Sequence, residues 1–198
     1  MDDRIYTLGL FIHVVAVTGL FFGIGLELLQ VTWLRRAQTV GQVQQLDTLE
    51  SILKRLMPTA VVLIVASGLF MLIKGWSWSA HWAEVAFVSL VVATVLGSGV
   101  LARKSEAIGK TARNEPPGAI SESLRAQIVD PVLYTAAWVL AGLGIGILYL
   151  MTNKPETVES VAVMVVAVAL AVAGARLTDR SSAVPSEARE VESAGTRQ

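Results

Sequence analysis

Apolar residues in this chain are gathered into five long runs, separated by more polar stretches. The runs cover residues 5–34, 56–73, 82–102, 131–151 and 158–177. An α-helix needs about 20 residues to cross a hydrocarbon core roughly 30 Å thick, and every run is close to or above that length. Backbone amides in lipid must be hydrogen-bonded within their own segment, so each run is predicted to be a helix. The pattern predicts an all-α polytopic membrane bundle of five transmembrane helices in residues 1–177.

Two polar stretches carry signals that begin helices. The letters DTLE, residues 47–50, have the spacing of a capping box, which predicts that the second helix starts there, ahead of its apolar run. Pro58 lies inside that helix and favours a kink. Asp130 and Pro131 combine an N-cap aspartate with a proline at the first helical position, which predicts the start of the fourth helix.

Two further polar segments lie outside the runs. In residues 119–129, Ile120, Leu124 and Ile128 recur every four residues, which predicts a short amphipathic helix. This helix either lies on the inner membrane surface or is solvated and leads into the fourth span. Residues 178–198 are small and polar without periodicity, so they are predicted to form a disordered tail on the cytoplasmic side.

The distribution of Lys and Arg predicts the orientation. If the spans alternate in direction, only Arg4, Lys74 and Lys154 of the 16 basic residues fall on the side of the N-terminus. All the others fall on the opposite side: Arg35, Arg36, Lys54, Arg55, Arg103, Lys104, Lys110, Arg113, Arg125, Arg176, Arg180, Arg189 and Arg197. Basic loops stay in the cytoplasm, so the N-terminus is predicted outside and the C-terminus cytoplasmic.

Composition agrees with a membrane protein and narrows its chemistry. Of the 198 residues, 54% are hydrophobic and 16% are charged, whereas a soluble domain has about 25% charged residues. The chain has no cysteine, which excludes disulfides, thiolate metal sites and cysteine nucleophiles. It also has no Walker loop, HExxH, GxSxG or Rossmann fingerprint. No catalytic residue is therefore predicted, and a function other than catalysis is favoured.

Two titratable side chains interrupt the first run, His13 and Glu27. Steps of three and four residues place both on one helix face, together with Gly9, Ala16 and Gly23. Small residues let a neighbouring helix approach closely, and ionisable side chains in membrane helices face the interior of the bundle. Fourteen residues of helix separate the two groups by about 21 Å, so each needs its own partners.

Two interpretations of Glu27 stay open. The structural one is an ion pair at the inner membrane boundary with Arg55, Arg103 or Lys104, which lie at the ends of neighbouring helices. The functional one is a proton or cation site. The three bases at the same depth favour the ion pair.

His13 also has two interpretations. Its imidazole either bonds a backbone carbonyl or hydroxyl group, or acts as a ligand or proton relay. Candidate companions in the outer half are His81 and Glu84, an i, i+3 pair, and Tyr149. Because His13 has few polar companions, we expect it to matter most for function and Glu27 to be mainly structural.

No cofactor is predicted. Two histidines on different helices are one way to hold a haem, but the estimated depths of His13 and His81 differ by about two helical turns. The five methionines are scattered and cysteine is absent, which disfavours copper. The absorption spectrum and metal content of the purified protein test both alternatives.

Two glycine pairs have the GxxxG spacing, Gly19 with Gly23 and Gly142 with Gly146. This spacing favours close helix packing. Packing within the chain is favoured over pairing between two chains, and a homo-oligomer stays open.

The stretches LGLFIHVVAVTGLFFGIGLELL and RLMPTAVVLIVASGLFMLIKGW resemble a group of small, uncharacterised bacterial integral-membrane proteins. That group is similar in turn to the copper-resistance D (CopD) type membrane domain. The positions that carry the resemblance are His13, Ser67, Gly68, Gly75, Trp76 and Trp78. The uncharacterised group implies no activity, and the copper-related relatives imply metal transfer.

These observations leave two function hypotheses for a multi-pass protein of the bacterial cytoplasmic membrane. The first is permeation or transfer of a proton, metal ion or small molecule through a site near His13. The second is a structural or interaction scaffold that docks partners on a basic cytoplasmic face, and a haem-binding redox protein comes third. The predicted partner is the lipid bilayer, and nucleic acid is not expected as a partner.

Overall fold

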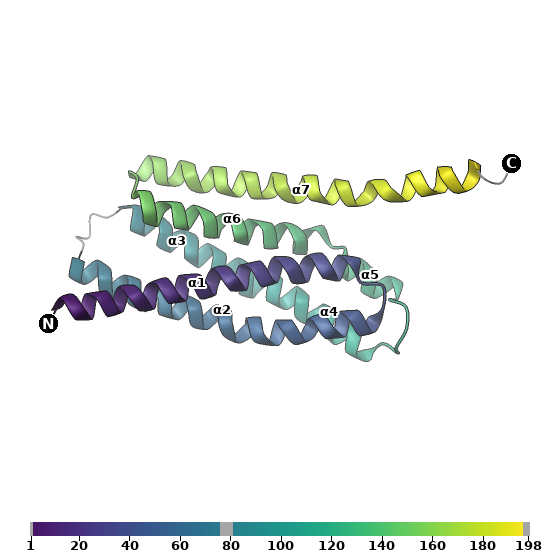
Figure 1. The fold of residues 1–198 in the computed structure, drawn as a ribbon, viewed down its shortest axis with the longest axis horizontal. Coiled ribbons are helices and arrows are strands. Elements are labelled where there is room, and N and C mark those ends of the chain that lie inside the picture. Colours follow the sequence, from purple (N-terminus) through teal and green to yellow (C-terminus); the bar gives the residue numbers. More distant parts are fainter. Residues whose placement is uncertain (1, 76–80, 196–198) are drawn as a thin grey trace.

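The computed structural model describes the backbone of residues 2–75 and 81–195, and the side chains of residues 4–74 and 81–179. Within these residues the chain is helical, apart from short connections and one isolated bridge between Thr39 and Ala119. The helical elements are α1 (Asp2–Arg36), α2 (Val40–Gly75), α3 (His81–Leu96), η1 (Gly97–Leu101), α4 (Ala102–Asn114), α5 (Glu122–Ile128), α6 (Pro131–Asn153) and α7 (Thr157–Gly195) (Figure 1).

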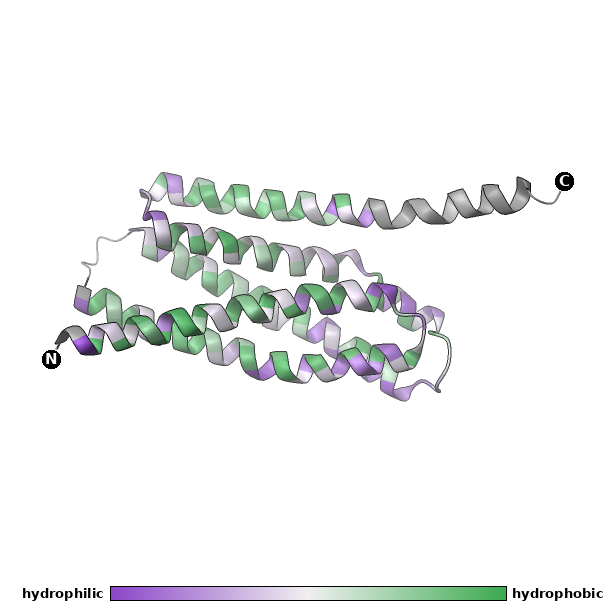
Figure 2. Ribbon diagram, in the orientation of Figure 1, coloured by the Kyte–Doolittle hydropathy of each residue, from purple (hydrophilic) through white to green (hydrophobic). Residues whose placement is uncertain are grey.

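Five segments of the described chain are long and apolar enough to cross a membrane, which confirms the predicted all-α class with five spanning helices. They are Arg4–Arg36, Val40–Lys74, His81–Asn114, Glu122–Asn153 and Thr157–Asp179. Figure 2 shows hydrophobic residues along the middle of the rods and hydrophilic ones gathered toward one end. Large apolar side chains such as Phe11, Phe22 and Leu170 point outward and are exposed, as contact with hydrocarbon requires.

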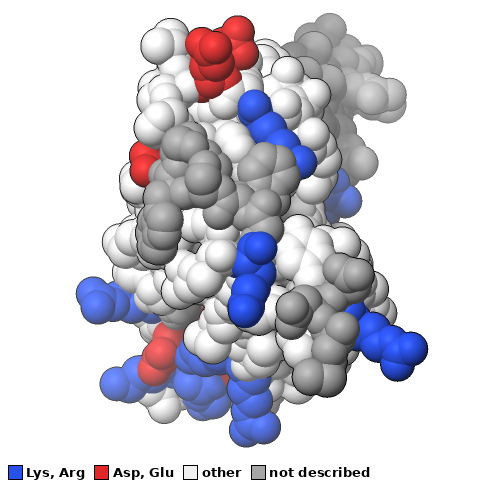
Figure 3. All heavy atoms as spheres, turned by 90° about the vertical axis from the view of Figure 1, so that its left-hand side faces the viewer, with Lys and Arg blue, Asp and Glu red and all other residues white. Residues whose placement is uncertain are grey.

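The helices pack as two antiparallel pairs, which contact each other through α1 and α6 and are also bridged by a third rod (Figure 1). α1 packs on α2, and α6 packs on α7. The continuous rod of α3, η1 and α4 contacts α6 through α3 and α2 through α4. We call the end with residues 35–55 and 103–130 the basic end, and the opposite end the N-terminal end. Viewed onto the N-terminal end (Figure 3), most of the surface is uncharged, with acidic and basic groups side by side near its upper edge and mostly basic groups across its lower part.

The start of α2 differs from the prediction. The helix begins at Val40, before the predicted capping box, because a different cap forms there. The backbone N–H groups of Gln38 and Thr39 donate to Gln42 Oε1 at 2.8 and 3.3 Å, and Gln42 N donates to Thr39 Oγ1 at 3.4 Å. Val40 and Val43 are fully buried and anchor this first turn. The DTLE stretch therefore lies inside the helix, and its acidic side chains make tertiary contacts.

The amphipathic segment at residues 119–129 packs against the bundle. Its helical part is α5, whose N-cap Ser121 accepts a hydrogen bond from the Leu124 backbone N–H at 3.2 Å. Leu124 and Ile128 are fully buried in the main hydrophobic core. The apolar stripe of α5 therefore packs inside the protein, while Glu122, Ser123 and Ala126 on its other face are exposed and the segment leads into α6.

The start of α6 confirms its prediction. Asp130 caps the helix by accepting a hydrogen bond from the Val132 N–H at 2.8 Å, and proline follows at the first position. α2 continues as a helix through Pro58. α7 extends to Gly195 and so includes much of the segment that the sequence predicted to be disordered. The letters SEAREVESA contain several good helix formers, which accounts for this continuation.

A π-helical turn was not foreseen from the sequence. η1, with the sequence GSGVL, interrupts the regular turns between α3 and α4 and contacts α6. A π-turn adds a residue to the helix and rotates the residues after it. On either side of it the buried positions form a single stripe, with Ala86, Leu90 and Ala93 before the turn and Leu101 and Ser105 after it. The turn therefore keeps Ser105 directed into the bundle.

Candidate functional site

Four polar side chains are buried in the half of the bundle nearest the basic end. They are Glu27 and Gln30 on α1, Glu50 on α2 and Ser105 on α4, with 6%, 2%, 4% and 5% of their surface exposed. Glu27 and Gln30 are one helical turn apart and so share the inward face of α1. Buried polar groups in an apolar bundle are costly unless they are paired, which makes this cluster the principal candidate site.

Hydrogen bonding satisfies this cluster only in part. Gln30 Nε2 donates to Glu50 Oε2 at 3.2 Å, and Glu27 lies close enough to Glu50 for their charges to interact. Within the part of the chain that the structure describes, Glu27 Oε1, Gln30 Oε1 and Ser105 Oγ are buried and have no hydrogen-bond partner. Such groups are uncommon in folded proteins and call for an explanation.

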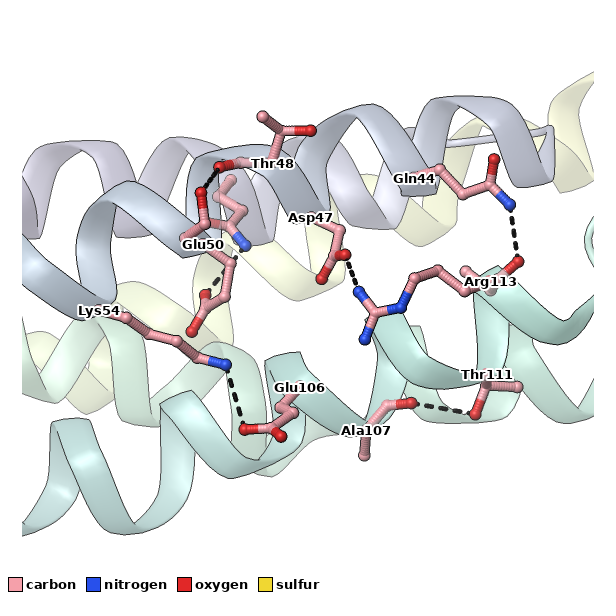
Figure 4. A network of polar contacts seen from close by, with 12 residues as sticks. Gln44, Asp47, Thr48, Glu50, Lys54, Glu106, Ala107, Thr111 and Arg113 are labelled. Atoms are coloured by element: carbon pink, nitrogen blue, oxygen red, sulfur yellow. Dashed lines mark hydrogen bonds and ion pairs between the residues drawn. The ribbon is translucent and has the colours of Figure 1, made fainter.

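Polar contacts between α2 and α4 surround the cluster (Figure 4). Asp47 forms an ion pair with Arg113, and Lys54 Nζ lies 3.1 Å from Glu106 Oε2. Gln44 Nε2 donates to the carbonyl oxygen of Ala112 at 2.9 Å. Asp47, Glu50 and Lys54 are spaced three and four residues apart, so one face of α2 carries both the surface ion pairs and the buried acid. These contacts hold α2 against α4 at the basic end.

A small cavity of about 10 Å³ lies beside the cluster. Its polar lining comes from Gln30, Asp47 and Ser105. The remaining lining residues are Leu34, Val43, Ile108 and Gly109. A Cβ atom at Gly109 would overlap the Asp47 carboxylate. Because glycine has no side chain, Asp47 can pack directly against α4 at this position.

A wider groove of about 450 Å³ lies on the outside of the basic end. Its lining residues, from the end of α1 and the start of α2, are Trp33, Arg36, Ala37, Gln42, Gln45, Leu46 and Leu49. None of the residues that line this groove also lines the small cavity, and neither Glu27 nor Glu50 is among them.

The ion pair expected for Glu27 is not found among the described residues. Lys104 bonds the α6 cap Asp130, and Arg55 and Arg103 form no ion pair in the described chain. Glu27 is therefore a buried acid beside a second buried acid. Sequence reasoning did not include Glu50 and Ser105 in a site, and it took Glu50 for a capping residue. The only signal for Gln30 was its position on the same face of α1 as Glu27.

His13 has a partner on α2. Its Nδ1 lies 3.0 Å from Ser67 Oγ, and a Cβ atom at Gly68 would lie 3.3 Å from His13 Cε1. These are three of the positions that carry the family resemblance, while Trp76 and Trp78 lie outside the described residues. The structure therefore places the His13 side chain against Ser67 and Gly68 of α2.

The candidate companions of His13 do not join it. His81 Nδ1 lies 3.5 Å from Glu84 Oε2, and both side chains are exposed. Tyr149 is also exposed. In the described part of the chain, no hydrogen bond links any of the three to His13. The same part contains no group of three His, Asp or Glu side chains that could hold a metal ion.

The glycine pairs face helices of the same chain. A Cβ atom at Gly142 would lie 2.7 Å from Ala171 Cβ, and one at Gly146 would lie 2.6 Å from Met164 Sδ, both on α7. A Cβ atom at Gly23 would overlap Met57 on α2, whereas one at Gly19 would lie 4.0 Å from the nearest atom. The closest approach is at Gly142, where an added Cβ atom would also lie 2.8 Å from the Ala167 carbonyl oxygen, whereas Gly23 and Gly146 face flexible methionine side chains.

The fold and the buried cluster define an all-α bundle of five helices able to span a membrane, with paired acids buried near its basic end. Comparison with protein-family models, with curated proteins and with solved structures gives no match. The resemblance to the CopD-type domain stays a prediction. The function is therefore inferred from the geometry of this chain alone.

Proposed function

We propose that this is a multi-pass protein of the bacterial cytoplasmic membrane that takes up a proton from the cytoplasm at Glu27 and Glu50 and transfers it across the membrane. The observation that carries this proposal is the buried Glu27 carboxyl group, whose Oε1 lacks a hydrogen-bond partner in the described chain, next to the buried Glu50.

The electrostatics of the pair favour a proton as the ligand. Two carboxylates buried close together repel each other, and a proton on one of them removes the repulsion. Gln30 donates its amide hydrogen to Glu50, so Glu50 has a donor that stabilises its negative charge. Glu27 lacks such a donor at Oε1. We therefore assign Glu27 as the group that takes up the proton.

The position of the pair supports access from the cytoplasm. The predicted topology places the basic end in the cytoplasm, and there the partly exposed Asp47 lies near the cluster. Between Glu27 and His13, the inward face of α1 is apolar, with Ala16 and Ile24 buried. About 21 Å of helix separates Glu27 from His13. Transfer therefore needs a second arrangement of the helices that opens the other half, as in alternating access.

A proton also suits the available space better than a larger substrate. Sites for small molecules usually have volumes of about 300–1,000 Å³, whereas the cavity beside the cluster is about 10 Å³. The groove of about 450 Å³ is large enough, but neither buried acid lines it. A proton needs only carboxyl groups and water. Among the cargoes suggested by the sequence, the geometry therefore supports the proton best.

The scaffold hypothesis has less support because acids neutralise part of the basic end. Four of its basic side chains form ion pairs: Arg35 with Asp179, Lys54 with Glu106, Lys104 with Asp130 and Arg113 with Asp47. These contacts join helices of the chain to one another, so these bases are engaged within the bundle.

Proton flux into liposomes tests the proposal. Purified protein is reconstituted with a pH-sensitive dye inside, and a potassium gradient with valinomycin drives proton entry. We expect faster acidification than in protein-free liposomes, and loss of that increment in Glu27→Gln. Glu84→Gln is the matched control, because it removes an exposed acid at the N-terminal end. Wild-type flux equal to that of protein-free liposomes, or full flux in Glu27→Gln, would overturn the proposal.

A further inference from the structure

The small cavity between α1, α2 and α4 has the size and lining of a site for one water molecule. Its volume of about 10 Å³ corresponds to roughly one probe sphere, the least that a bound water requires. A buried water also needs two to four polar partners. Three polar side chains line the cavity, namely Gln30, Asp47 and Ser105. Both the volume of the cavity and its polar lining therefore fit one bound water molecule.

The hydrogen-bonding state of the lining residues points independently to a ligand. Gln30 Oε1 and Ser105 Oγ are both buried and lack a partner in the described chain, although both residues line the cavity. Gln30 and Ser105 are more than nine-tenths buried, so bulk solvent does not satisfy them. One water can donate to Gln30 Oε1 and to the Asp47 carboxylate while it accepts the Ser105 hydroxyl hydrogen. A single molecule then satisfies both orphaned groups.

We propose that this cavity is a hydration site that holds one water bound to Gln30, Asp47 and Ser105, and that it forms the entrance for protons moving toward Glu50 and Glu27. The second part rests on the proposed function, whereas the hydration site stands by itself. Asp47 is partly exposed and borders the cavity on its solvent side. Gln30, which bonds Glu50, borders it on the buried side. The water thus lies between a surface acid and the buried acids.

The local sequence explains why the site is small. Gly109 leaves room for the Asp47 carboxylate, which packs directly against the backbone of α4. The ion pair with Arg113 holds Asp47 in that place. Leu34, Val43 and Ile108 close the remaining sides and are buried. Any added carbon atom in the lining therefore competes with the water.

Radiolytic hydroxyl-radical labelling of the full-length protein in lipid nanodiscs tests the hydration site. A bound water converted to hydroxyl radical oxidises the side chains beside it, even where bulk solvent does not reach. We expect at least one of Leu34, Val43 and Ile108 to be oxidised faster than Leu133 and Leu150, which are equally buried but line no part of this cavity. Labelling of all three at the level of those two controls would overturn the hydration site without any variant.

Two substitutions at one position then test the entrance. Ser105→Thr keeps the hydroxyl and adds a methyl group that fills the cavity, so the labelling should fall to the control level and proton flux should slow. Ser105→Ala keeps the cavity and removes one partner, so labelling should persist in weakened form. Normal flux in Ser105→Thr after loss of labelling would overturn the entrance role. Labelling in a wild-type protein that conducts no protons would support the water site and overturn the proposed function instead.

Discussion

His13 Nδ1 lies 3.0 Å from Ser67 Oγ, and the same hydroxyl donates its hydrogen to the carbonyl oxygen of Leu63. This pairing uses the serine hydrogen, so we assign the imidazole as the donor, through a hydrogen on Nδ1. His13 thus has a satisfied bond to α2, unlike Glu27. The proposed function therefore rests on Glu27, whereas the sequence led us to expect that His13 is the more important group.

The His13–Ser67 bond should be measurable as a coupling between α1 and α2. A double-mutant cycle of His13→Ala and Ser67→Ala, read from unfolding in detergent, should give a coupling free energy of about 1 kcal/mol. His13→Gln should retain much of the stability, because its amide can donate to the same oxygen. A coupling indistinguishable from zero would show that the bond does not form. Proton flux of His13→Gln tests separately whether His13 also carries protons.

Glu27→Gln should leave the stability of the protein unchanged or raise it. The substitution keeps the shape of the side chain and removes a buried acid that has no cationic partner among the described residues. An acid in a buried ion pair would behave differently, because loss of one partner costs about 3–5 kcal/mol. Thermal unfolding in detergent distinguishes the two cases, and a loss of that size would restore the ion-pair interpretation.

Gly109→Ala should destabilise the basic end. The added Cβ atom meets the Asp47 carboxylate, so Asp47 must move and its ion pair with Arg113 is disturbed. Overpacking of this kind costs about 1–3 kcal/mol. Gly25→Ala is the matched control, since nothing lies within 4 Å of its added atom. A helical glycine in open space gains about 0.5–1 kcal/mol from alanine, so the two variants should shift the unfolding temperature in opposite directions.

Gly142→Ala should separate α6 from α7. Its Cβ atom would lie 2.7 Å from Ala171 Cβ and 2.8 Å from the Ala167 carbonyl oxygen, so backbone as well as side chain must shift. We expect a loss of about 1–3 kcal/mol of stability. Gly19→Ala has the same GxxxG context but its added atom lies 4.0 Å from Leu56, so it should be tolerated. Equal effects of the two substitutions would contradict the packing seen here.

The orientation of the bundle is open to direct measurement in cells. The chain has no cysteine, so a single introduced cysteine reports one position. Glu84→Cys lies at the N-terminal end and Lys110→Cys at the basic end, and both native side chains are exposed. An impermeant thiol reagent applied to intact cells should label only the first. Labelling of Lys110→Cys alone would invert the topology and place the buried acids near the outer surface.

The amino-acid sequence by itself determined the class of the fold. Runs of about 20 apolar residues have few other stable arrangements in lipid, because backbone groups there must bond within their own segment. Local signals also sufficed where they act over a few residues, as with the Asp130 cap and Pro131 at the start of α6. The DTLE signal gave the wrong start for α2, because Thr39 and Gln42 cap the helix several residues before it.

Only the tertiary structure decided which polar groups meet. A helical pattern shows that Glu27 faces inward, but the partner across the interface depends on how far α1 and α2 slide along each other. That register brings the buried Glu50 close to Glu27 and Gln30, while Lys104 bonds Asp130 instead. The π-turn η1 then directs Ser105 into the bundle. Contacts between residues far apart in the chain therefore created the site, which no local pattern encodes.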